Sequence, residues 1–221
     1  MDFFDVEFAL HILPVILKYV KVTLSLSLLS MLFGLTLAFI ISLIIDAKIP
    51  IIYRILKTYV SFFRGTPLLV QLFLVYFGLA HVFTSMASLS SFGAACIVMS
   101  LNSSAYMSES IRGAILAIDK GQMEASLSVG MTYFQAMRRI ILPQAFKVAI
   151  PALSNTFINL IKNSSLAFTI GVVEITASAQ LEATSSYKYL EAYFDILIIY
   201  WIITSALTYL QKKLEERLSH S

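Results

Sequence analysis

The chain has 221 residues, of which 58% are hydrophobic and 13% are charged. Soluble domains usually carry about 25% charged residues, so this composition excludes an ordinary soluble domain. The net charge of +3 is small and belongs to loops, and it does not indicate a nucleic-acid-binding face. The composition predicts an integral membrane protein with no nucleic-acid partner.

Two long uncharged runs carry this prediction. Val22–Ile45 is 24 residues long, and Gly65–Ser108 is 44 residues long. A membrane-spanning helix needs about 20 apolar residues, so the second run is long enough for two crossings and a turn. The first residues, MDFFDVE, are acidic and lack the basic start of a cleavable signal peptide.

The pattern predicts an all-α, polytopic membrane protein with about five transmembrane helices. In chain order these spans are expected at about Leu13–Ile45, Ile51–Ala80, Phe92–Ala117, Val148–Val173 and Tyr193–Leu210. The division of 148–192 is the least defined. We expect an N-terminal extracytoplasmic or interfacial segment at 1–18, a membrane domain at 19–210 and a cytoplasmic tail at 211–221.

Basic residues predict the orientation, because they favour cytoplasmic loops. They cluster in 46–64, in 109–147 and in the tail: Lys48, Arg54, Lys57, Arg64, Arg112, Lys120, Arg138, Arg139, Lys147, Lys212, Lys213 and Arg217. The N-terminus and 174–195 are mainly acidic. The N-terminus is therefore expected outside and the C-terminus in the cytoplasm, with a cytoplasmic loop at about 118–147.

This cytoplasmic loop is the most charged loop of the chain. We expect Gly121 to break the chain after the third span, and Gln122–Gly130 to form a short amphipathic helix. Glu124 near its start suits the positive end of the helix dipole, and Gly130 permits a sharp turn. Ala125, Ser126 and Leu127 would offer a small, smooth surface. From the residues alone, this segment is either a docking helix or an ordinary interfacial helix.

A resemblance favours the docking helix. The order Glu124-Ala125-Ser126, then Gly130, then Ile140 and Leu142-Pro143 resembles the EAA loop of bacterial ABC importer permeases, E-A-A, three residues, G, nine residues, I-x-L-P. Ser126 replaces the second alanine, a change of one small residue for another. The resemblance implies that these seven residues dock on a cytoplasmic ATPase and transmit its ATP-driven closure to the spans. Pro143 would mark the return into the membrane.

Further motifs resemble the permeases for polar amino acids. Phe63–Leu69 is similar to their F-R-G-T-P segment, 105–113 to A-Y-x-x-E-x-x-R-G, and 117–122 to I-x-x-G-Q. Residues 162–166 resemble K-D-T-S-L, with Asn163 where aspartate is usual. The resemblance covers nearly all of 19–210 and implies the transmembrane domain of a type I ABC importer. Within the family, the chain is most similar to L-cystine permeases; glutamine, arginine or histidine, and glutamate are the alternative cargoes.

The resemblance also implies the partners. The chain has no G-x-x-x-x-G-K-[ST] phosphate-binding loop, so ATP and Mg²⁺ are expected on a separate cytoplasmic ATPase dimer, and this chain is expected to bind no cofactor and not to be an enzyme. His11, His81 and His220 lie far apart without a metal-ligand neighbour at i+3 or i+4, so no metal site is expected. A separate extracytoplasmic solute-binding protein is implied. Five spans are too few to enclose a pathway, so a second permease subunit, identical or paralogous, is expected. The location would be the bacterial cell membrane, in contact with lipid.

Polar residues within the spans are candidates for the path of the solute, because such residues are costly in a bilayer. The candidates are Arg64, Gln71, Asn102, Glu109, Asn159, Lys162 and Asn163. Glu109 and Lys162 could complement the ammonium and carboxylate of an amino acid. Equally, they could pair with each other, or Glu109 could pair with Arg112 at i, i+3. Arg64 could reach the headgroups, and the amides could join helices.

Two other functional classes compete with an ATP-driven importer. A membrane enzyme would need a cluster of catalytic groups, and no nucleophile elbow, histidine pair or dense carboxylate cluster is present. A gradient-driven secondary transporter is commonly built from internal repeats, and none is visible. The docking loop also argues against a transporter that works without an ATPase.

Overall fold

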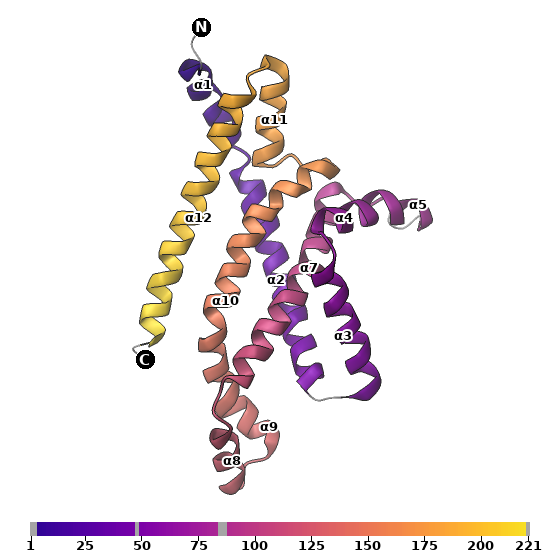
Figure 1. Ribbon diagram of the computed structural model, residues 1–221, viewed down its shortest axis with the longest axis vertical. Coiled ribbons are helices and arrows are strands. Elements are labelled where there is room, and N and C mark those ends of the chain that lie inside the picture. The colour runs from indigo at the N-terminus through magenta and orange to yellow at the C-terminus, as the bar shows by residue number, and fades with distance from the viewer. Residues whose placement is uncertain (1–3, 47–48, 84–87, 220–221) are drawn as a thin grey trace.

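The computed structural model describes residues 4–46, 49–83 and 88–219, and Figure 1 shows these parts as a set of packed helices. The all-helical membrane fold expected from the sequence is confirmed. The helices are α1 (Val6–Leu17), α2 (Val20–Asp46), α3 (Pro50–Gly65), α4 (Leu68–Phe73), α5 (Ala80–Val82), α7 (Ser91–Leu116), α8 (Lys120–Ser128), α9 (Tyr133–Ala136), α10 (Leu142–Asn163), α11 (Ile175–Ser186) and α12 (Tyr189–Ser219). Lys48, one of the basic residues used for the orientation, lies outside the described residues.

The first two predicted spans are each divided. The first breaks at Lys18 and Tyr19, which separate α1 from α2. The second bends by 109° between α3 and the stretch Leu68–Val82. Pro67 explains this bend, because proline disfavours helical backbone at the residue before it, and Thr66 is extended, with φ −121° and ψ 146°. A π-helical segment, Leu74–Leu79, continues α4 into α5.

The described part contains two helices, α2 and α12, that are long and apolar enough by themselves to cross a membrane, and up to four spans if each bent pair counts as one. The predicted third span is α7, which is 26 residues long. It is serine-rich and carries Asn102, Glu109 and Arg112, which lowers its hydropathy. Its packing in the interior of the bundle accounts for this polarity, because α2, α3 and α10 cover it.

The region 148–192 forms two helices joined by a tight turn. α10 passes into a 3₁₀ helix, Ser164–Ile170, and Gly171 then adopts a left-handed conformation with φ 90°. Glu174 is buried and caps α11, accepting from the backbone N–H of Ala177 at 3.0 Å and from the Tyr200 hydroxyl at 2.8 Å. This carboxylate therefore fixes α11 against α12. The predicted fifth span is longer than expected and includes most of the tail.

Small residues allow α2 and α7 to pack closely along their length. α2 buries Ser27, Ser30, Gly34 and Ala38, while α7 buries a series of alanines and serines. A Cβ added to Gly34 would lie 2.5 Å from the Ser103 Oγ, 2.9 Å from the Met107 Cε and 3.1 Å from the Ser100 carbonyl oxygen. Small residues at such contacts are typical of membrane helices, because they let backbones approach.

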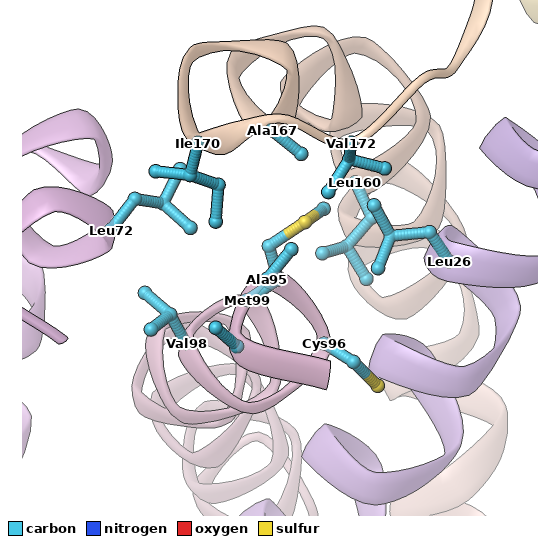
Figure 2. Close-up of a cluster of buried hydrophobic side chains, with 11 residues drawn as sticks. Leu26, Leu72, Ala95, Cys96, Val98, Met99, Leu160, Ala167, Ile170 and Val172 are labelled. Carbon is cyan, nitrogen blue, oxygen red and sulfur yellow. The ribbon is translucent and has the colours of Figure 1, made fainter. Parts of the chain in front are cut away.

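The largest buried cluster ties five parts of the chain together, as Figure 2 shows. Leu26 of α2, Leu72 of α4, Met99 of α7, Leu160 of α10 and Ala167 of the 3₁₀ helix all belong to it. The cluster holds α4 against α7 and α10 beyond the bend at Pro67. It thereby shapes the neighbouring pocket described below.

The N-terminal end and the α8–α9 segment lie at opposite ends of the molecule in Figure 1. α12 begins near α1 and runs back toward the end that carries α8 and α9. The segment between α7 and α10 therefore forms a separate tip, distant from the N-terminus.

Candidate functional site

The tip is built from α8, α9 and the turns between them. The Asp119 side chain caps α8 by accepting from the backbone N–H of Gly121 at 2.8 Å. The break between α7 and α8 therefore lies at Asp119, whereas the sequence predicted it at Gly121, two residues later. Gly130 has a left-handed φ of 85°, which glycine adopts without steric cost, so the expected sharp turn is present.

A capping box starts α9 and orients the second half of the tip. The Thr132 side chain accepts from the backbone N–H of Gln135, and the Gln135 side chain accepts from the backbone N–H of Thr132 at 2.9 Å. The Tyr133 hydroxyl donates to Asp46 at 3.0 Å. The tip is thereby tied to the end of α2, which gives it a defined direction relative to the bundle.

The seven predicted docking residues divide into two groups. Glu124, Ala125, Gly130 and Pro143 are exposed, whereas Ile140 and Leu142 are half-buried and pack against a cluster formed by α7, α10 and the π-helical segment Met137–Ile141. Ser126 does not offer a surface as expected: it is buried, and its hydroxyl donates to the Gln122 carbonyl at 2.6 Å. The buried members position the tip, and the exposed members are available to a partner.

The tip also exposes apolar side chains that the motif did not single out. Val129 is 76% exposed and Phe134 is 72% exposed, and Leu127 and Tyr133 are exposed beside them. Large apolar residues gathered at an exposed tip are typical of a docking surface. Their spacing gave no periodic signal, because the turn at Gly130 separates them in the sequence.

Glu109 lies in a charged group that does not include Lys162. Its carboxylate is bonded to the Lys57 ammonium at 3.0 Å and to the Arg112 guanidinium at 2.7 Å. Of the alternatives that the sequence left open, the i, i+3 pair of Glu109 with Arg112 is confirmed, and the prediction of a pair between Glu109 and Lys162 is wrong. Lys57, which the sequence gave only as a loop cation, joins α3 to α7. Lys162 is exposed and has no ion pair within the described residues.

A polar pocket lies between the start of α4, the middle of α7 and the second half of α10. Its volume is about 300 Å³, and it is lined by Thr66, Pro67, Leu68, Met99, Asn102, Ser103, Tyr106, Thr156, Asn159, Leu160 and Asn163. None of these lining residues carries a charge. Pockets of a few hundred Å³ with a few converging polar groups are typical of small-molecule sites.

The pocket brings together three of the predicted path residues, Asn102, Asn159 and Asn163. Gln71 is buried behind them and bonded to Asn102. The Arg64 guanidinium lies 5.6 Å from the centre of the Tyr106 ring, outside the lining. Glu109 and Lys162 do not line the pocket either.

Sequence reasoning missed the four hydroxyl-bearing residues of the lining, Thr66, Tyr106, Ser103 and Thr156. The first two lie within motifs that the sequence showed, F-R-G-T-P and A-Y-x-x-E, so a signal was available. Thr156 precedes Asn159 by three residues on α10 and gave no signal of its own.

The model of a protein family described as the inner membrane component of binding-protein-dependent transport systems matches residues 34–220. The probable amino-acid ABC transporter permease PatM of Vibrio harveyi is 50% identical over 98% of this chain and 97% of its own length. The L-cystine transport system permease TcyB of Bacillus subtilis is 44% identical over 93% of this chain and 87% of its own length. A crystal structure of an amino acid ABC transporter with histidines contains a chain that is 38% identical, with a TM-score of 0.87 over 92% of this chain and 94% of that one.

Proposed function

The chain belongs to the family of inner membrane components of binding-protein-dependent transport systems, and on this premise we propose that it carries a polar amino acid, L-cystine first, across the cell membrane. It is the permease subunit of an ABC importer for amino acids, a multi-pass inner membrane protein, and not itself an ATPase. The observation that carries the proposal is the uncharged polar pocket between α4, α7 and α10, with its three asparagine amides.

L-cystine is supported by the 44% identity with an L-cystine permease over most of both chains. A permease whose name specifies no particular amino acid is 50% identical, a higher identity than that with the L-cystine permease. Glutamine, arginine or histidine, and glutamate are therefore the competing cargoes.

Membership of the family implies an ATPase and a solute-binding protein as partners. In our proposal, the ATPase is a cytoplasmic dimer that holds ATP and Mg²⁺, and it binds the exposed tip at α8 and α9. A second permease subunit, identical or paralogous, completes the pathway. The N-terminus lies outside and the C-terminus in the cytoplasm, so the loaded binding protein docks at the end opposite the tip.

Transport would proceed by alternating access. ATP closes the ATPase dimer, and α8 transmits the movement to α7, which precedes the tip in the chain, and to α10, which follows it. The pathway then opens outward and receives the amino acid. Hydrolysis returns the permease to an inward-open state, and the amino acid is released into the cytoplasm. The three asparagines line the proposed path and Gln71 is bonded to Asn102 behind them, whereas Arg64, Glu109 and Lys162 lie outside the pocket lining.

Reconstitution tests the transport function and its cargo. The permease, its ATPase and its binding protein are placed in liposomes, and ATP hydrolysis and uptake are measured with L-cystine, L-glutamine, L-arginine and L-glutamate. We expect L-cystine to stimulate both. Stimulation by another amino acid alone would refute the cargo, and uptake driven by an ion gradient without the ATPase would refute the mechanism.

A matched pair of substitutions tests the docking surface. Val129→Asp places a charge on the exposed tip, and Val6→Asp places the same charge on an exposed valine of α1 at the opposite end. Burying an unpaired carboxylate in an interface costs several kcal/mol. We expect the first variant to lose the co-purifying ATPase and the second to retain it. Equal recovery of the ATPase with both variants would contradict docking at the tip.

A further inference from the structure

The polar pocket offers few side-chain hydrogen-bond donors to a ligand, because its hydroxyl groups already donate to backbone carbonyls of the protein. Thr66, Ser103 and Thr156 each donate to a backbone carbonyl three or four residues earlier, at 2.8, 3.2 and 2.9 Å. The Tyr106 hydroxyl points to the Arg64 carbonyl at 3.4 Å. A hydroxyl group has one proton, so these four groups offer only lone pairs to a ligand.

The Asn102 amide is restricted in the same way. Its Nδ2 donates to the Phe63 carbonyl at 3.0 Å and to the Gln71 Oε1 at 3.1 Å. A backbone carbonyl can only accept, so the atom that faces Phe63 must be the nitrogen. Both hydrogens of this amide are engaged, and its Oδ1 remains as an acceptor for a ligand.

Gln71 holds this arrangement in place from behind the pocket. Its Nε2 lies within 3.1 Å of the Phe63 and Thr66 carbonyls and 2.8 Å from the Thr66 hydroxyl oxygen. Because both carbonyls only accept, Gln71 must turn its nitrogen to them and its oxygen to Asn102. The side chain is 4% exposed, so it cannot turn over without leaving buried groups unpaired.

The α10 side of the pocket differs from this. Asn159 and Asn163 are four residues apart on one face of α10, and neither amide has a hydrogen-bond partner among the described residues. Each amide still offers two donors and an acceptor. Within the lining that the structure describes, Asn159 and Asn163 hold the side-chain donors that make no hydrogen bond to the protein.

We propose that the pocket binds an α-amino acid in one orientation, with its ammonium group at Asn102 and its carboxylate at Asn159 and Asn163. A carboxylate only accepts and an ammonium only donates, so each group finds its complement on one side alone. Gln71 is a positioning residue that fixes the Asn102 oxygen toward the ligand. This inference rests on the proposed function and deepens it, because it assigns the two main-chain groups of the cargo to opposite walls.

The reverse orientation is chemically conceivable and gives the opposite result in the test. It would place the carboxylate at the first turn of α4, where backbone N–H groups begin the helix at Leu68. The Asn102 oxygen and the Thr66 lone pairs belong to this same wall, and they would repel a carboxylate. The orientation that we propose avoids this repulsion.

The test measures equilibrium binding to the purified permease–ATPase complex in lipid nanodiscs without the binding protein, so that the affinity reports the permease. The probes are L-cystine, L-glutamine, L-arginine and L-glutamate, each compared with its desamino acid and its decarboxylated amine. For L-cystine, these analogues are 3,3′-dithiodipropionate and cystamine. Losing a hydrogen bond to a charged group weakens binding by roughly 10-fold or more, so the wild-type complex is expected to prefer the parent amino acid by about that factor.

Each wall is then tested with its own variant. Asn102→Leu is expected to bind the parent about 10-fold more weakly while its affinity for the desamino acid stays unchanged. The double variant Asn159→Leu/Asn163→Leu is expected to show the same pattern with the decarboxylated amine. Gln71→Leu should reproduce the Asn102→Leu pattern in part, whereas a merely structural role would weaken all three probes equally.

Asn155→Leu is the matched control, because Asn155 precedes Asn159 by one turn on α10 and does not line the pocket. It should bind all probes like the wild type. Co-purification of the ATPase shows that each variant is folded. Exchanged patterns for the two walls would overturn the orientation, and uniform losses would overturn the inference while leaving the proposed function intact. If none of the four parents binds or is transported by the wild type, the proposed function and this inference both fail.

Discussion

Replacing Gly34 by alanine tests the closest contact of the fold, that between α2 and α7. The added Cβ would lie 2.5 Å from the Ser103 Oγ and 3.1 Å from the Ser100 carbonyl oxygen, both well inside ordinary van der Waals contact. Ser103 is buried and bonded to Ser100 at 3.2 Å, so the hydroxyl has little room to move. The two helices must separate slightly, or the hydrogen bond must break.

The magnitude follows from two opposing effects. Overpacking a close contact costs about 1–3 kcal/mol, whereas replacing a helical glycine by alanine gains up to about 1 kcal/mol from helix propensity. Gly113→Ala isolates the first effect, because Gly113 lies inside α7 and a Cβ there would meet nothing within 4 Å. The propensity gain is common to both variants, so Gly34→Ala should be less stable than Gly113→Ala by about 1–3 kcal/mol.

Thermal unfolding of the purified complex, followed by fluorescence-detected size exclusion, measures this difference. For a chain of this length, 1 kcal/mol shifts Tm by about 2–4 °C. The double variant Gly34→Ala/Ser103→Ala removes the nearest clashing atom, and it should recover much of the loss. Equal apparent Tm values for Gly34→Ala and Gly113→Ala would refute the reasoning, as would a double variant no more stable than Gly34→Ala.

Three further outcomes follow from other contacts. Glu109→Gln leaves Lys57 and Arg112 without their common partner and should lower the apparent Tm by several degrees, because an unpaired charged group costs about 1–3 kcal/mol or more. Lys57→Met leaves the pair between Glu109 and Arg112 intact, so it should lower the apparent Tm by less. A larger loss for Lys57→Met than for Glu109→Gln would contradict the pairing of Glu109 with both cations. Tyr133→Phe removes the exposed bond to Asp46 at 3.0 Å and should cost no more than about 1 kcal/mol, measured by the same unfolding assay. The Lys188 side chain, bonded to Asp5, and the backbone N–H of Phe8 hold the pKa of Asp5 below its usual value. The charged form of Asp5 therefore stabilises the fold above its usual pKa of about 4, and this contribution is lost as the pH falls through the lowered pKa. Asp5→Asn should be less stable than the wild type near pH 7, and the difference should shrink as the pH falls through the lowered pKa; a difference that does not change with pH would exclude the pair as its origin.

Much of the site was accessible from local sequence. The order Glu124, Gly130 and Pro143 predicted the position of the tip, because a helix, a turn and the start of the next helix depend on residues that follow one another in the chain. The positive φ of Gly130 and the position of Pro143 in the first turn of α10 confirm that local chemistry. Ser126 shows the limit, since the face of a short helix that turns inward depends on what packs beneath it.

The polar path was less accessible for a related reason. The pairing of Glu109 with Lys57 joins residues 52 positions apart, and no spacing rule relates two such positions. The bend of 109° at Pro67 directs α4 to the side of α7, and it places Thr66 and Leu68 in the pocket. Pro67 is visible in the sequence, but the angle of the bend depends on the packing of Leu72 in the cluster with Met99 and Leu160.

The sequence by itself determined the helical membrane class, the family and the position of the α8–α9 tip, because hydropathy, basic residues and contiguous motifs are local properties of the chain. The tertiary structure alone decided which polar groups meet, and which of their donors remain free. Asn102 and Asn159 look alike in the sequence, yet one has both amide hydrogens engaged and the other has no hydrogen-bond partner among the described residues. Hydrogen bonding between helices creates that difference, and it depends on which helix faces the fold brings together.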